Sequence, residues 1–129
     1  MNAQNNDLTR IQEIYDVLVQ TQRQIAELGM TSSRFLHPDS TAEELIVEGL
    51  ENRVFRVAEE GGTLSPEAEH YGFERKAMKG LRNILAHDYG QVDHRIIWNV
   101  LEKEFPRMLD ACRAYSESLG VDLHETNLH

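Results

Sequence analysis

Residues 93–120 read DHRIIWNVLEKEFPRMLDACRAYSESLG. Apolar side chains recur there in steps of 4, 4, 3, 4, 3 and 4 residues, at Ile97, Leu101, Phe105, Met108, Cys112, Tyr115 and Leu119. This period predicts a long helix with one buried face. Asp93 is expected to cap its start and Gly120 to end it, while Pro106 predicts a kink or a junction between two helices.

A first helix is expected from about Asp7, acting as its cap, to Leu28, with Gly29 ending it. Residues 30–40 are rich in Thr, Ser, Pro and Asp, which predicts a loop.

A second helix should begin at Thr41, because Thr41-Ala42-Glu43-Glu44 is typical of a capping box, and should end at Gly61-Gly62. Ser65-Pro66-Glu67 is a start signal for a third helix, which should run to about His87 or Tyr89. The apolar positions expected on these two helices include Leu45, Val47, Leu50, Val54, Val57, Ala58, Phe73, Ala77, Leu81, Ile84 and Leu85.

These segments predict an all-α fold, an up-and-down bundle of four to five helices. The length of 129 residues fits one domain, placed at 1–120 and followed by a flexible tail at 121–129. The single cysteine excludes a disulfide framework and a cysteine metal site. No apolar stretch has the length of a signal peptide or membrane span, so we expect a cytoplasmic protein without a membrane partner.

The charge is distributed unevenly. The net charge of −9 argues against constitutive binding of nucleic acid by bulk electrostatics. Residues 75–113, however, hold eight Lys/Arg against five Asp/Glu, and the rest of the chain holds five against seventeen. The basic excess is either chance or a locally positive groove for phosphates on an acidic body.

The chemistry-bearing residues lie in this basic stretch, in GLRNILAHDY at residues 80–89. The Arg82 guanidinium suits a phosphate and the charge that grows on a phosphorane. Histidine, here His87, is the side chain whose ordinary pKa suits proton transfer near neutral pH. Together these groups can cleave RNA without a metal or cofactor: one group takes the proton of a 2′-hydroxyl, which attacks the adjacent phosphate, and Arg82 stabilises the transition state.

On a straight helix Arg82 and His87 point about 140° apart, whereas Arg82 and Tyr89 share a face. Either the helix ends or distorts near His87, or the two residues meet across a two-fold interface. We prefer the interface, because a homodimer would gather two copies of each residue around one cleft. The plainer alternative is structural: arginine and histidine near a helix end often bond backbone carbonyls, and Asn83 can simply cap or bridge.

A metal site is a further alternative. His87-Asp88 is also the paired motif of metal-dependent phosphohydrolases, which need another His and Asp, such as His94 and Asp93. Those two adjacent side chains diverge by about 100° on a helix, which disfavours this interpretation.

The motif and its flanks resemble the HepT-like family of the HEPN superfamily. The family pattern is Arg, four residues, His, one residue, Tyr, in a Gly-Leu-Arg-Asn setting followed by Val-Asp. Matching positions here are Gly80, Leu81, Arg82, Asn83, Leu85, Ala86, His87, Tyr89, Val92 and Asp93. The similarity covers roughly residues 70–115, including the Glu104-Phe105-Pro106 turn. The segment around Asn52–Glu59 departs from the family, with Arg53 and Arg56 at usually apolar positions.

The resemblance implies a HEPN-like bundle that forms a homodimer and acts as a metal-independent endoribonuclease toxin. It assigns catalysis to Arg82 and His87, a supporting role to Asn83, and adenylylation to Tyr89 by an MNT-type minimal nucleotidyltransferase antitoxin. Such a modification would add a bulky anion beside the groove and repel RNA. The alternative is a catalytically inactive HEPN binding module that partners a nucleotidyltransferase.

Overall fold

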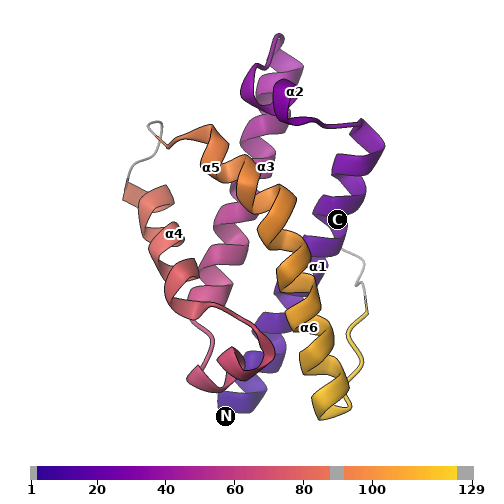
Figure 1. Cartoon of the computed structure of the whole chain (residues 1–129), viewed down its shortest axis with the longest axis vertical. Coiled ribbons are helices and arrows are strands. Elements are labelled where there is room, and N and C mark those ends of the chain that lie inside the picture. The colour runs from indigo at the N-terminus through magenta and orange to yellow at the C-terminus, as the bar shows by residue number, and fades with distance from the viewer. Residues whose placement is uncertain (1–2, 88–91, 125–129) are drawn as a thin grey trace.

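The structure, a computed structural model, describes residues 3–87 and 92–124, with side chains from Asn6 onward. Within these ranges there is no strand. Four long arms alternate in direction along one axis (Figure 1). These arms are α1 (Ala3–Leu28), α3 (Thr41–Gly62), α4 (Arg75–His87) and a final arm of α5 (His94–Asn99), η2 (Val100–Glu104) and α6 (Phe105–Leu119). The predicted all-α bundle is confirmed.

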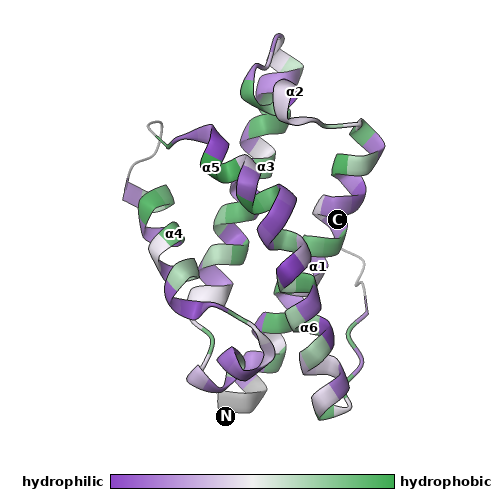
Figure 2. Ribbon diagram, viewed as in Figure 1, coloured by the Kyte–Doolittle hydropathy of each residue, from purple (hydrophilic) through white to green (hydrophobic). Residues whose placement is uncertain are grey.

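One hydrophobic core runs between the arms. Hydrophobic and hydrophilic residues alternate along each ribbon, as expected of helices with one buried face (Figure 2). The largest fully buried side chains include Phe35, Phe105, Ile11, Ile14, Leu18 and Ile97. Three positions predicted on apolar faces are instead exposed: Leu45 at 63%, Ile84 at 47%, and the small side chain of Ala77.

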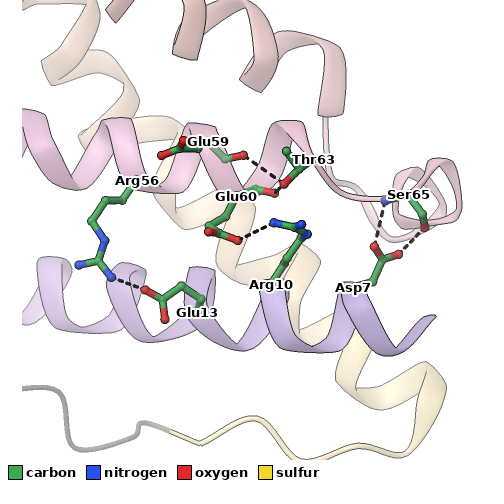
Figure 3. Close-up of polar contacts among 8 residues, drawn as sticks. All are labelled: Asp7, Arg10, Glu13, Arg56, Glu59, Glu60, Thr63 and Ser65. Atoms are coloured by element: carbon green, nitrogen blue, oxygen red, sulfur yellow. Dashed lines mark hydrogen bonds and ion pairs between the residues drawn. The ribbon is translucent and has the colours of Figure 1, made fainter. Parts of the chain in front are cut away.

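The first helix starts earlier than predicted, at Ala3, and Asp7 is not its cap. Asp7 is only 5% exposed. Its carboxylate accepts a 2.9 Å hydrogen bond from the Ser65 backbone N–H and another from the Ser65 hydroxyl (Figure 3). The residue therefore ties α1 to the chain that follows α3. Gly29 ends α1 as predicted, with φ +60°, which favours glycine.

Ion pairs reinforce the packing of α1 on α3. Arg10 Nη1 lies 3.2 Å from Glu60 Oε2, and Arg56 pairs with Glu13 one turn away (Figure 3). All four side chains are partly exposed, so each pair contributes at most about 1 kcal/mol.

The predicted loop at 30–40 contains a short helix, α2 (Ser32–Leu36). The Thr31 hydroxyl caps it by accepting from Arg34 N–H at 3.2 Å, and Phe35 is buried in the core. The cap of α3 also differs by one residue from the prediction. Ser40, rather than Thr41, accepts from the N–H three residues on, that of Glu43, at 3.1 Å.

Gly61 and Gly62 lie inside the end of α3 rather than beyond it. A Cβ on Gly61 would lie 1.8 Å from Met78 Sδ, and one on Gly62 would lie 3.1 Å from Lys79 Cα. Both glycines are therefore explained by the close approach of α4.

The predicted third helix is divided. A 3₁₀ segment, η1 (Pro66–Tyr71), ends at Gly72, whose φ of +108° suits only glycine. Phe73 is buried between η1 and α4. Ser65, the expected cap, turns its hydroxyl to Asp7 instead. Because η1 ends at Gly72, α4 is a separate helix and can pack along α3.

In the final arm, the backbone hydrogen-bond pattern changes next to Pro106. Asp93 caps α5 as predicted, accepting from Arg95 N–H at 2.9 Å. The segment η2 is π-helical: Phe105 N–H donates to Val100 O, five residues back. This wide turn accommodates Pro106, which has no N–H to donate. Gly120 ends α6 with φ +64°, also as predicted.

Residues 121–124 follow α6 without helical structure, and Val121 and Leu123 are partly buried against the core. Gln12 Nε2 donates to His124 O at 2.9 Å. Across the described part of the chain, no helix is both long and apolar enough to cross a membrane.

Candidate functional site

Helix α4 carries the motif on the side away from the core. Met78 and Leu85 are buried against the bundle, and Leu81 is half-buried beside them. The glycines of α3 let the first half of α4 lie close to it. Because buried residues occupy one face, the turn-by-turn geometry presents the polar motif residues to solvent.

Arg82 lies at the junction of α4 and α3. Its guanidinium carbon is 5.9 Å from the centroid of the Phe55 ring, within cation–π range. Its Nη2 is 4.0 Å from Glu59 Oε1, at the outer limit of an ion pair. The side chain remains 39% exposed. Arg82 is thus oriented by weak contacts that a phosphate can displace.

The other motif residues are exposed or lie outside the described ranges. Asn83 is exposed, and its Oδ1 accepts a long 3.4 Å contact from Arg82 Nη1. His87 is exposed and is the last residue of α4, where a cation interacts favourably with the helix dipole. Tyr89, the predicted modification site, lies outside the described residues, as does Asp88.

The structure does not bring Arg82 and His87 together within one chain. The helix is regular from Arg75 to His87, so the two side chains leave it about 140° apart. Within the described ranges, the contacts of Arg82 run to α3 and to Asn83. Both geometric possibilities from the sequence therefore remain: the end of α4 at His87, and a second copy.

A groove of about 520 Å³ lies beside this site, between α3 and the end of α4. Its floor is apolar and includes Val47, Phe55 and Leu85, while its rim is acidic. Phe55 also contacts the Arg82 guanidinium, so the groove borders the site. The rim residues Glu44, Glu48 and Glu51 make it unsuitable for phosphates.

A pair of titratable groups closes one wall of this groove. His94 Nε2 lies 2.5 Å from Glu51 Oε1, joining the start of α5 to α3. Burial raises the pKa of the Glu51 carboxyl, the nearby His94 opposes that rise, and Glu48 adds to it. His94 is therefore engaged with α3 rather than with the motif.

The remaining candidate groups do not form a second site. No three His, Cys, Asp or Glu side chains gather closely enough to hold a metal in the ranges 3–87 and 92–124. Asp93, named for such a site, pairs with Arg95. Cys112 is buried, which raises the pKa of its thiol to about 12, so it is not a nucleophile. Trp98 packs 5.3 Å from the Phe35 ring as a core residue.

Comparison with known families decides the relationship. The family model described as "Ribonuclease HepT-like" matches residues 11–115. The chain belongs to the HepT-like ribonuclease family. The match spans α1 through most of α6, so the HepT-like unit is the whole helical bundle rather than its second half alone. No curated protein and no solved structure matches the chain.

The resemblance found in the sequence is thereby confirmed. Arg82, Asn83 and His87 all lie inside the matched HepT-like region. Two neighbours of the site were missed by sequence reasoning, Phe55 and Glu59, which flank Arg82 from α3. They are four residues apart and so share one helix face, but only the packing of α3 on α4 places Arg82 above them.

Proposed function

We propose that this chain is a metal-independent endoribonuclease, the toxin of a HEPN/MNT-type toxin–antitoxin pair. The observation that carries the proposal is the HepT-like family match over residues 11–115. It is supported by a partly exposed arginine and an exposed asparagine and histidine along one basic helix.

The proposed chemistry is cleavage by an internal nucleophile. The 2′-oxygen forms a bond to the adjacent phosphorus, and the bond from phosphorus to the 5′-oxygen breaks. The products are a 2′,3′-cyclic phosphate and a free 5′-hydroxyl. His87 takes the proton of the 2′-hydroxyl as a base and then gives a proton to the leaving 5′-oxygen as an acid. Arg82 stabilises the charge on the phosphorane oxygens, and Asn83 holds the guanidinium.

The first test is cleavage of a mixed RNA by the purified chain in EDTA. We expect the wild type to cut and to leave cyclic phosphate ends. His87→Ala should lower kcat/KM by about 10²–10⁴-fold, the usual contribution of acid–base catalysis. Arg82→Ala should lower it by about 10²–10³-fold, the usual effect of losing one electrostatic stabiliser.

Two matched controls accompany these variants. His70→Ala removes an exposed histidine from η1, and Arg113→Ala removes an exposed arginine from α6. Both should cut at the wild-type rate. Cleavage that survives in Arg82→Ala and His87→Ala would place the site elsewhere. A folded wild type that never cuts RNA would instead favour the binding-module function.

We also propose a homodimer in which the motif residues of two copies share one cleft. A second groove, of about 330 Å³, follows the other flank of α4, with Ala77 and Leu81 facing Val100 and Met108. Ile84 on α4 is 47% exposed, and Ile96 on α5 is 49% exposed. Exposed apolar side chains beside an unfilled groove are found at interfaces between protein chains.

Silencing by an MNT-type nucleotidyltransferase is the last part of the proposal. The Tyr89 hydroxyl attacks the α-phosphorus of ATP, the new bond joins oxygen to AMP, and pyrophosphate leaves. Tyr89 is two residues beyond His87 in sequence, so a bound AMP would place its negative charge close to the proposed catalytic histidine.

A further inference from the structure

The first two turns of α4 carry a basic surface. The helix contains Arg75, Lys76, Lys79 and Arg82 and has no Asp or Glu. Its neighbour α3 carries an opposite surface, where Glu44, Glu48 and Glu51 rim the larger groove. The acidic body of the chain therefore leaves α4 as a narrow positive strip.

Two of these cations have no ion-pair partner in the described part of the chain. Arg75 donates to Leu64 O at 2.5 Å and pairs with Glu69 at 3.3 Å, so its guanidinium already has partners within the chain. Lys76 and Lys79 are exposed, and neither makes an ion pair with the described carboxylates. Their charges are available to an external anion.

The two lysines lie in line with the motif. At 100° per residue, Lys76, Gly80, Asn83 and His87 fall within about 60° of one another around the helix. Lys79 lies beside them on the flank towards α3, as Arg82 does. From Lys76 to His87 the strip is about 16 Å long, so it can contact more than one phosphate group of a strand.

Gly80 sits in the middle of this strip. It is exposed, and a Cβ built on it would meet no atom within 4 Å. Glycine inside a helix costs stability relative to alanine, and packing within this chain does not require it here. A helix surface without a side chain at this point lets a backbone approach between Lys76 and Asn83.

Resting on the proposed RNA-cleaving function, we infer that Lys76 and Lys79 bind phosphates of the RNA strand that flank the phosphate held by Arg82. The strand lies along the exposed face of α4, across Gly80, and is kept off α3 by the glutamates. The lysines supply affinity and register, while Arg82 and His87 carry out the chemistry.

The test separates binding from cleavage by using a single-stranded 2′-O-methyl RNA, which lacks the attacking hydroxyl. Affinity is measured by fluorescence anisotropy over a range of KCl concentrations. Each of Lys76→Gln and Lys79→Gln should reduce the slope of log affinity against log salt by about 0.7, the value for one single-strand phosphate contact. The double variant should bind on the order of tenfold more weakly near 0.1 M salt.

Lys103→Gln is the matched control. Lys103 is exposed on η2 and has no ion pair with a described carboxylate. Its replacement by Gln changes the net charge by the same amount as each single lysine substitution in α4. Its affinity and salt slope should equal those of the wild type. With unmodified RNA, the lysine double variant should raise KM and leave kcat nearly unchanged.

The outcomes distinguish this inference from the proposed function. If Lys76 and Lys79 set the affinity for 2′-O-methyl RNA but the wild type never cuts RNA, the inference stands and the nuclease proposal fails. If cleavage depends on Arg82 and His87 while the lysine variants bind like Lys103→Gln, the inference is overturned. A folded wild type that does not bind the RNA also overturns it.

Discussion

Arg82 combines exposure with partial restraint. The Phe55 ring and Glu59 hold its guanidinium from α3, and Asn83 contacts it from α4. None of these contacts is a short, buried ion pair, so displacing them costs little. An arginine held in this way loses less side-chain entropy when it binds phosphate than one that moves freely in solvent.

The proposed adenylylation of Tyr89 can be tested by mass spectrometry and by RNA cleavage. We expect incubation of the chain with ATP and a partner nucleotidyltransferase to increase its mass by one or more adenylyl groups and to stop RNA cleavage. Tyr89→Phe should keep nuclease activity and resist both changes. Tyr15→Phe, at a partly exposed tyrosine of α1, should behave like the wild type. An adenylyl group detected by mass spectrometry on the Tyr89→Phe chain would contradict this assignment.

Sequence reasoning identified the exposed motif residues but not their neighbours. Arg82, Asn83 and His87 are recognisable because their spacing is local to one helix. Phe55 and Glu59 come from a different helix, and their contact with Arg82 depends on how α3 and α4 are aligned lengthwise. That alignment is determined by Gly61 and Gly62 against α4, which the sequence pattern suggested only as a helix end.

The glycines of α3 and α4 should respond oppositely to the same substitution. Gly80→Ala adds a methyl group in open space inside a helix, so we expect a gain of up to about 1 kcal/mol in the free energy of unfolding. Gly61→Ala forces the new Cβ onto Met78 Sδ, so we expect a loss of about 1–3 kcal/mol. Urea denaturation followed by circular dichroism measures both.

The same pair of variants also bears on function. If RNA crosses Gly80, then Gly80→Ala should bind RNA more weakly although it is more stable. A Gly80→Ala chain that is less stable than the wild type would show that the glycine is needed by the fold itself.

Helix positions were predictable from periodicity, whereas details at their ends were not. Ser40 and Thr41 are both good caps, and the sequence cannot rank two adjacent hydroxyls. Helix α2 has only five residues and depends on burying Phe35, which is a tertiary contact. The break between η1 and α4 likewise depends on Gly72 and on the burial of Phe73.

The proposed dimer can be tested by placing a charge on the apolar flank of α4. Ile84→Glu should convert a dimer to a monomer in light scattering and abolish cleavage if the cleft is shared. Leu45→Glu is the matched control, since Leu45 is an even more exposed apolar residue, on α3. A wild-type monomer that cuts RNA would refute the shared cleft.

Charge is separated over the whole molecule, with a basic strip on α4 and an acidic groove along α3. A net charge of −9 disfavours random attachment to nucleic acid, and the basic strip of α4 is short. RNA binding should therefore weaken with salt only as far as this short strip allows, with a slope of about 0.7 for each phosphate contacted. The acidic, apolar groove along α3 borders the site at Phe55 but is electrostatically unsuitable for RNA.

The π-helical turn η2 has a consequence for how this chain can change. Ile97, Leu101 and Phe105 are all buried along this segment, where a turn closed by an i to i+5 bond is wider than an α turn. The wide turn separates the rotational phase of α5, which brings Trp98 to Phe35, from that of α6. Substitutions in one end of the arm can thus change how that end packs on its neighbouring helix, without rotating the other end out of the core.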